Sequence, residues 1–292
     1  MKRVLLTIAL VGACAVSALA QQTSAFPPPR TDTVPPSDVQ AVDALKNSPR
    51  HGEMIDVKMP DGQILKTWIV YPMRPGKAGV VIVIHEIYGL SDWARGVADQ
   101  VAKDGFIAIA PDLLSGFGPN GGGTAEAGDQ TTTVIRQVTP AIAMVRLNAI
   151  MAYGKSLPSS NGKTATVGFC WGGDKSFAFA TAQPELAGAV VFYGQVPMKT
   201  VDGKQVPDPD QVAKINAPVL GFYGSSDARV TSTVEPTTAA MKAAGKSYSP
   251  TVYEGASHGF MRQQGSDAAL TNYKAAEQAW PLVVKFFQDR LK

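Results

Sequence analysis

The chain has 292 residues, of which 45% are hydrophobic and 17% are charged, and its formal net charge is +3. This composition is typical of a globular protein with one large domain or two small ones. The small charge excess and the lack of a lysine- and arginine-rich cluster argue against a nucleic-acid partner.

The first 20 residues have the three parts of a secretory signal peptide. Met1-Lys2-Arg3 is a basic start, residues 4–13 are an apolar run too short to span a bilayer, and Ala18-Leu19-Ala20 is an A-x-A cleavage site. We therefore expect an exported protein, periplasmic or secreted, without stable membrane insertion. The weaker alternative is a lipoprotein, because residues 11–14 loosely resemble a lipobox that ends at Cys14.

A proline-rich stretch follows the signal peptide. Residues 21–40 contain five prolines and few apolar side chains. This composition predicts a flexible tether, which we place at 21–45, in front of a folded domain at 46–292.

From about residue 51 the pattern predicts alternating strands and helices. Asp61-Gly62 separates two apolar segments and predicts a β-hairpin. The short apolar runs after it are typical of strands buried on both faces, and segments of helical periodicity separate them. The predicted strands are 54–59, 63–71, 79–84, 106–110, 163–169, 186–193, 218–223 and 249–253, and the predicted helices are 91–104, 140–156, 171–182, 234–244 and 267–291. The fold class is therefore α/β, with a mostly parallel central sheet, helices on both faces and an antiparallel hairpin at its start.

Cys170 lies between two glycines in Gly168-Phe169-Cys170-Trp171-Gly172, at the junction of a predicted strand and helix. This is the context of a nucleophile elbow, a strained turn in which larger residues at the glycines would collide with neighbouring elements. The N-terminus of the following helix favours the thiolate. The cysteine count alone favours an inert buried thiol, because removal of a signal peptide would leave Cys170 as the single cysteine. The elbow context favours a nucleophile.

The rest of a catalytic triad follows in the chain order of α/β-hydrolases, which is nucleophile, acid, histidine. Asp227 follows a predicted strand, and His258 follows the next one and is the only histidine after Cys170. His258 would act as base and Asp227 would orient it. Asp208 and Asp210 are rivals for the acid, but neither follows a predicted strand.

The loop at 84–90 ends the first buried strand and carries further candidates. The backbone amide of Ile87, together with that of Trp171, would form an oxyanion hole. Glu86 would place a carboxylate beside the nucleophile, and a surface or capping role is its simpler alternative. His85 suits packing better than base catalysis.

These segments form a set of motifs that runs through most of the chain. They are Ile84-His85-Glu86-Ile87-Tyr88-Gly89, Ala110-Pro111-Asp112-Leu113, Gly168-Phe169-Cys170-Trp171-Gly172-Gly173, Gly224-Ser225-Ser226-Asp227 and His258-Gly259-Phe260. In this order they resemble the dienelactone hydrolase family, from about residue 52 to the C-terminus. The resemblance implies an α/β-hydrolase fold and a hydrolase of enol-lactones that uses neither metal nor organic cofactor. It also implies that Glu86 pairs with the thiol at rest and swings away when substrate binds.

The resemblance is incomplete at the substrate clamp. The family holds a substrate carboxylate with two arginines; Arg262 matches one, but Gly116 stands where the other is expected. Arg136 is a possible replacement that the sequence does not place. The glycine-rich segment 116–128 would form a mobile rim near the site.

We therefore expect a monomeric enzyme that opens a small lactone or ester through Cys170, His258 and Asp227. The first alternative is a carboxylesterase of broad scope that does not act on dienelactone, which the missing arginine favours. A non-catalytic binding protein on the same fold is the second alternative. A thiol redox role is disfavoured, because the chain has no C-x-x-C motif.

Overall fold

The computed structural model describes residues 33–265 and 269–292. The predicted signal peptide, Cys14 and residues 21–32 of the predicted tether lie outside the described residues.

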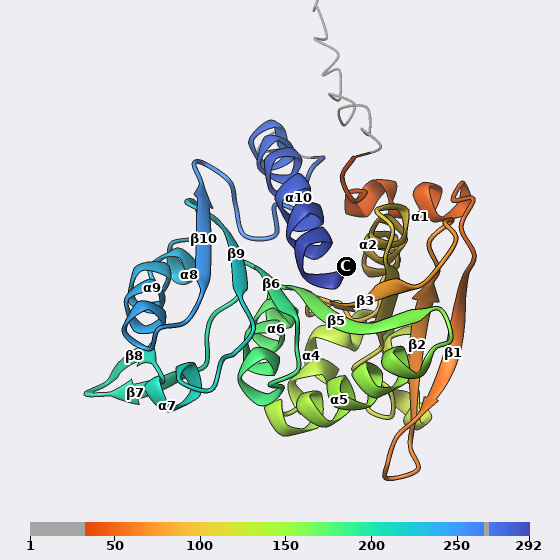
Figure 1. Cartoon of the computed structure of the whole chain (residues 1–292), viewed down its shortest axis with the longest axis horizontal. Helices are drawn as coiled ribbons and strands as arrows, with labels where there is room; N and C mark the ends of the chain where they lie inside the picture. The colour runs from red at the N-terminus through yellow and green to blue at the C-terminus, as the bar shows by residue number, and fades with distance from the viewer. Residues whose placement is uncertain (1–32, 266–268) are drawn as a thin grey trace, which may run out of the picture.

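A twisted sheet of eight strands forms the centre of the molecule (Figure 1), in the order β1-β2-β4-β3-β5-β6-β9-β10. β1 pairs antiparallel with β2 and β2 with β4, and every other neighbouring pair is parallel. The strands are β1 (Gly52–Lys58), β2 (Ile64–Val70), β3 (Ala78–Ile84), β4 (Ile107–Pro111), β5 (Ser160–Phe169), β6 (Gly188–Phe192), β9 (Val219–Gly224) and β10 (Tyr248–Tyr253). The mostly parallel sheet and its antiparallel hairpin are confirmed.

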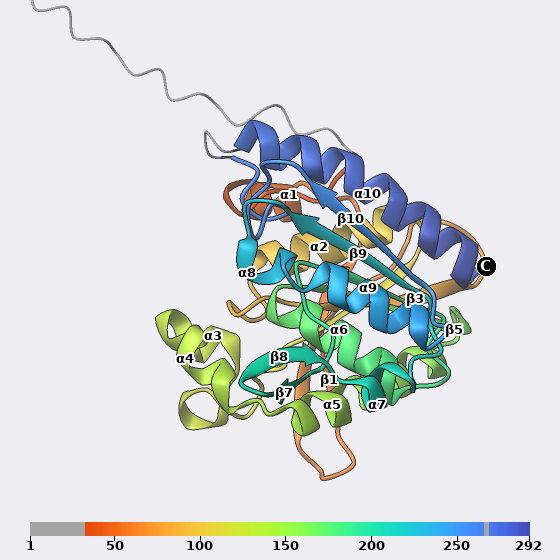
Figure 2. The same cartoon turned by 90° about the vertical axis from the view of Figure 1, so that its left-hand side faces the viewer.

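Helices cover both faces of this sheet (Figure 2): α1, α2 and α10 lie on one face, and α5, α6 and α9 on the other. The helices are α1 (Asp38–Lys46), α2 (Asp92–Lys103), α3 (Thr124–Ala127), α4 (Thr131–Val134), α5 (Pro140–Ser156), α6 (Trp171–Ala182), α7 (Pro209–Val212), α8 (Ala228–Thr231), α9 (Val234–Ala243) and α10 (Ala269–Leu291). Short 3₁₀ turns stand at η1 (Pro119–Gly121), η2 (Gly128–Gln130) and η3 (Ile135–Gln137). In the described part of the chain, no helix is both long and apolar enough to cross a bilayer.

The parallel strands are buried on both faces, which explains their continuous apolar sequences. Side chains alternate along a strand, so Val81 and Val83 pack in the core under α2 and α10, whereas Val80 and Ile82 pack in the core under α5 and α6. All four are at most 1% exposed. The sheet is therefore a rigid base for the loops at its carboxyl ends.

The predicted tether is wrong for its last part, because α1 is a packed helix. Ala41 is fully buried, and the indole nitrogen of Trp93 on α2 donates to the carbonyl of Pro36 at 3.0 Å. The side chain of Gln40 accepts from the backbone N–H of Ser37 at 3.3 Å. The S-x-x-Q pattern of a helix start thus outweighs the proline content before it.

The glycine-rich segment is tied to the body of the protein. Thr124 donates its hydroxyl to Asp112 at 2.7 Å and accepts from the backbone N–H of Leu90 at 2.9 Å. The backbone N–H of Thr124 also donates to Asp112, at 2.7 Å. One side chain therefore connects the loops after β3 and β4 with this segment.

A small hairpin, β7 (Met198–Val201) and β8 (Lys204–Pro207), is absent from the sequence prediction. Asp202 and Gly203 form its turn with φ angles of 49° and 74°. The Asp-Gly pair is the usual signal for such a turn, but the flanking strands are short and polar, which hides the hairpin in the sequence.

Candidate active site

Cys170 stands in a strained turn between β5 and α6. Its φ is 53° and its ψ is −118°, a backbone conformation that residues other than glycine rarely adopt. A Cβ atom on Gly168 would collide with the carbonyl of Gly172, and one on Gly172 would collide with the carbonyls of Ile84 and His85. The two glycines therefore allow the turn to form against the end of β3.

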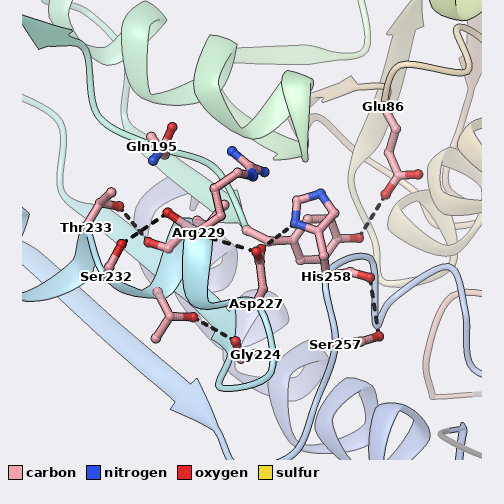
Figure 3. Close-up of polar contacts among 12 residues, drawn as sticks. Glu86, Gln195, Gly224, Asp227, Arg229, Ser232, Thr233, Ser257 and His258 are labelled. Atoms are coloured by element: carbon pink, nitrogen blue, oxygen red, sulfur yellow. Dashed lines mark hydrogen bonds and ion pairs between the residues drawn. The ribbon is translucent and has the colours of Figure 1, made fainter. Parts of the chain in front are cut away.

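Asp227 and His258 meet at the same edge of the sheet, in the loops after β9 and β10. Oδ2 of Asp227 lies 2.5 Å from Nδ1 of His258 (Figure 3). Because a carboxylate accepts this hydrogen bond, the proton is on Nδ1 and Nε2 is available as a base. Asp227 is 9% exposed and its other oxygen caps α8 through the N–H of Val230 at 3.4 Å. Asp208 instead caps α7.

Glu86 is buried in a network that includes Arg262 and Tyr193. Its Oε2 accepts from Nε of Arg262 at 2.9 Å, and its Oε1 accepts from the hydroxyl of Tyr193 at 3.1 Å. The ring of Tyr193 also lies 4.9 Å from the ring of His258. Burial raises the pKa of Glu86, and Arg262 and Tyr193 act in the opposite direction. These contacts differ from the thiol pairing that the resemblance implies.

The thiol of Cys170 is protonated in this site. Burial and, next, the charge of Glu86 raise the pKa of Cys170 to about 12, although the backbone N–H of Trp171 and the nearby Arg229 lower it. The helix N-terminus does lower the pKa of Cys170 through this N–H, but burial outweighs it. The helix stabilises the thiolate through one hydrogen bond, whereas burial removes the solvation of the whole thiolate charge.

The loop after β3 lies against the start of α6, where the predicted oxyanion hole would form. The side chains of Ile87 and Trp171 pack on the same small apolar cluster around Leu114 and Ile135. The backbone N–H of Trp171 acts on the thiol of Cys170, whose pKa it lowers. The two predicted donor residues thus lie in neighbouring segments, Ile87 in the loop after β3 and Trp171 at the first position of α6.

His85 is a buried packing residue. Its Nδ1 donates to the carbonyl of Glu86 at 2.7 Å, and its Nε2 accepts from the N–H of Leu113 at 3.1 Å. Burial lowers the pKa of His85, and its ring stacks on Trp171 at 5.7 Å. Both ring nitrogens are therefore engaged, as the packing alternative expects.

Arg262 and Gly116 mark the incomplete substrate clamp. Arg262 is bound to Glu86 and, through Nη1, to Asp38 at 2.6 Å. Near Gly116, the buried Arg146 donates to the carbonyls of Leu113 and Ser115 at 2.6 and 2.7 Å. Arg146 therefore holds the backbone of this loop.

Sequence reasoning missed three residues at the site, each with a weak signal. Tyr193 ends a predicted strand as its only polar aromatic residue. Asp38 follows Ser37 at the helix start described above. Arg229 is an exposed cation two residues after Asp227, and Figure 3 shows its side chain beside Asp227 and His258.

The side chains of interest lie at the carboxyl ends of β3, β5, β6, β9 and β10, where parallel sheets gather functional groups. They bring a thiol, an imidazole that a carboxylate orients, and backbone N–H groups to one edge of the sheet. Within residues 33–265 and 269–292, no group of three or more His, Cys, Asp or Glu side chains is placed to hold a metal ion.

Comparisons with known proteins agree with this architecture. The model of the dienelactone hydrolase family matches residues 65–291. The chain is 30% identical over 232 residues to the "Putative carboxymethylenebutenolidase" of Synechocystis sp., covering 77% of this chain and 92% of the relative. It is 29% identical to the protein of the same name from Escherichia coli, with coverages of 75% and 81%.

Solved structures show the same fold. The crystal structure of a "Putative Dienelactone Hydrolase" from Klebsiella pneumoniae superposes with a TM-score of 0.68 at 24% identity, covering 82% of this chain and 98% of that chain. A dienelactone hydrolase-like promiscuous phosphotriesterase from metagenomic libraries gives 0.65 at 20% identity, with coverages of 83% and 99%. Because the family model spans well over half of the sequence and the fold agrees, the chain belongs to the dienelactone hydrolase family, a family of ester-hydrolysing enzymes.

Proposed function

We propose that the protein opens a lactone or enol-ester through a triad of Cys170, His258 and Asp227. The observation that carries this proposal is the strained backbone of Cys170, at φ 53°, on the same sheet edge as the 2.5 Å contact between Asp227 and His258. An inert core thiol needs neither the strain nor the oriented imidazole.

In the proposed reaction, Sγ of Cys170 bonds to the substrate carbonyl carbon while Nε2 of His258 takes the thiol proton. The amides of Trp171 and Ile87 hold the oxyanion. The ring C–O bond then breaks, and His258 protonates the leaving enolate. A water molecule, deprotonated by His258, attacks the thioester and releases the acid and the free thiol. Asp227 keeps the imidazole oriented and stabilises its charged form.

Glu86 has a modulating role in this proposal. Its charge helps to keep the resting thiol protonated, and a neutral thiol oxidises more slowly than a thiolate. The proton leaves only when a substrate carbonyl is present to be attacked.

The test uses residues 21–292 with two substrates, a carboxylated dienelactone and a neutral aryl ester, each followed by absorbance. Both activities should be lost in Cys170→Ala, and rapid quenching followed by mass spectrometry should detect an acyl group on Cys170 of the wild type. Turnover that survives in Cys170→Ala would exclude the proposed nucleophile.

A carboxylesterase of broad scope is the second candidate. It is favoured by Gly116 at the position of the expected second arginine, and by the pairing of Arg262 with Glu86 and Asp38. Cysteine-dependent cleavage of the aryl ester, without opening of the dienelactone, would select this candidate.

We also propose that the protein is exported, from the signal-peptide pattern at residues 1–20. Expression of the full chain in a bacterium and N-terminal sequencing of the periplasmic fraction should give Gln21 as the first residue. A product that is acylated at Cys14 would support the lipoprotein alternative instead.

A further inference from the structure

Arg262 is paired with two carboxylates, through two of its three nitrogens. Nε lies 2.9 Å from Oε2 of Glu86, and Nη1 lies 2.6 Å from Oδ2 of Asp38. The face of the guanidinium lies over the ring of Tyr88, 4.7 Å from its centre. The Arg262 side chain is 17% exposed. A third carboxylate at this arginine therefore competes with two that are already bound there.

Asp38 is held in place by the segment that carries it. Its own backbone N–H donates to the carbonyl of Arg262 at 3.0 Å. Just before it, the carbonyl of Pro35 accepts from Gln264 at 3.3 Å, and that of Pro36 accepts from Trp93. The ion pair between Asp38 and Arg262 is thus one of several contacts that join the start of α1 to the loop after His258.

The cluster of Arg262, Asp38 and Glu86 has no net positive charge. Arg262 and Asp38 cancel one another when Glu86 is protonated, and the cluster is net negative when Glu86 is ionised. Either way, a substrate carboxylate gains no unpaired positive charge at Arg262, and it meets the negative charge of Asp38.

On the basis of the proposed function, we propose that Asp38 is a specificity-determining residue. By occupying Arg262 it makes the site select lactones and esters that carry no carboxylate beside the scissile group. Asp38 lies before the region at 65–291 that the family model matches. Gly116 points the same way, because it offers no second cation for a substrate carboxylate.

The test compares an enol-lactone that bears a free carboxylate with the methyl ester of the same molecule. We expect the wild type to have the higher kcat/KM for the methyl ester. Asp38→Asn should raise kcat/KM for the carboxylated lactone about tenfold and change the value for the methyl ester less than about twofold. Asp43→Asn, which changes an exposed carboxylate on the same helix, should leave the ratio unchanged. A wild type that prefers the carboxylated lactone, or a ratio that Asp38→Asn does not alter, would overturn the proposal.

A binding experiment separates this proposal from the proposed function. In the Cys170→Ala background, calorimetry with the carboxylated lactone should show about tenfold tighter binding when Asp38→Asn is added. The further change Arg262→Gln should abolish this gain, because the gain requires a freed guanidinium. If none of the turnover assays detects activity, the proposed function fails, but the binding series still decides the role of Asp38. Equal affinity with and without Asp38→Asn, in variants with the same melting temperature, would exclude that role.

Arg229 is an exposed cation whose charge also acts on Cys170. If the wild type binds the carboxylated lactone well and Arg229→Gln removes this binding, the carboxylate is held at Arg229, and Asp38 does not set the selectivity.

Discussion

At the residue scale, Cys170 at rest is a neutral thiol. Burial is the main cause of the high pKa of Cys170, and the carboxylate of Glu86 adds to it. The same carboxylate is shared by Arg262 and Tyr193, so the state of the thiol depends on contacts that Cys170 itself does not make. A neutral thiol resists oxidation, because the thiolate is the form that oxidants attack.

Removal of the Glu86 charge should make Cys170 more reactive at rest. In Glu86→Gln the pKa of Cys170 falls, and alkylation by iodoacetamide at pH 8 should become roughly tenfold faster, which corresponds to about one pKa unit. In the wild type the rate should still be rising with pH at pH 10, since the pKa of the thiol is about 12.

The matched control for this experiment is Glu235→Gln, which removes an exposed carboxylate on α9. Its alkylation rate should equal that of the wild type. A Glu86→Gln variant that reacts no faster than the wild type would show that the carboxylate does not suppress the thiolate.

At the element scale, the start of α6 is pressed against the end of β3. Gly172 makes this approach possible, and a carbonyl of β6 is also near, since a Cβ on Gly173 would lie 2.7 Å from the carbonyl oxygen of Phe192. The loops that carry Cys170 and Ile87 are therefore positioned by a contact between backbones.

Gly172→Ala should impair activity more than a general loss of stability explains. The added methyl group collides with backbone oxygens, which should cost about 1–3 kcal/mol of unfolding free energy and move the predicted oxyanion donors. We expect kcat to fall at least tenfold, measured on the aryl ester at a temperature where the variant is folded.

Gly162→Ala is the control, because Gly162 lies at the opposite end of β5 with open space around it and a φ of 85°. The backbone strain should cost about 1 kcal/mol and leave kcat unchanged. A Gly172→Ala enzyme with normal kcat would contradict the positioning role of this contact.

A second contact between elements is the one that Thr124 makes with Asp112 and Leu90. Thr124→Val keeps the shape of the side chain but removes both hydrogen bonds of its hydroxyl. One of the lost partners is the carboxylate of Asp112, which is only 5% exposed and therefore poorly reached by water. Urea denaturation should show a loss of about 1–3 kcal/mol. Thr133→Val, at an exposed position of α4, should lose less than about 0.5 kcal/mol. Equal losses in the two variants would mean that Thr124 does not anchor the glycine-rich segment.

At the scale of the whole molecule, the half-buried carboxylate of Asp104 connects α2 and α10 on one face of the sheet. Asp104 ends α2 and accepts from the indole nitrogen of Trp280 at 2.8 Å and from Gln100 at 3.2 Å. Burial raises the pKa of Asp104 from 3.8 to about 6. The folded state therefore binds this proton more tightly than the unfolded state does.

This group should make stability depend on pH. Its contribution is fully present below about pH 4 and is lost as the pH rises through about 6, and the loss amounts to at most about 3 kcal/mol. Asp104→Asn keeps an oxygen for Trp280 and removes the titration. The unfolding free energy of the variant, relative to that of the wild type, should therefore increase between pH 4.5 and pH 7.5.

The measurement is urea denaturation of both proteins at the two pH values. Asp129→Asn, at an exposed carboxylate, serves as control and should differ from the wild type by the same amount at both. A difference between Asp104→Asn and the wild type that does not vary with pH would rule out this titration.

The sequence by itself determined the fold class, most of the strands and helices, and the order of the candidate catalytic residues. These features follow from local patterns, namely apolar runs, the Asp61-Gly62 turn and the glycines around Cys170. The S-x-x-Q pattern at Ser37 was also in the sequence, but the composition around it favoured a tether.

Only the tertiary structure decided the state of the site. The contacts of Glu86 with Tyr193 and Arg262 join residues 107 and 176 positions apart, and that of Arg262 with Asp38 joins residues 224 positions apart. The pKa of Cys170 likewise depends on burial by many segments. Local propensity carries no information about such pairs, because charge and desolvation act through space and are defined only when the chain is folded.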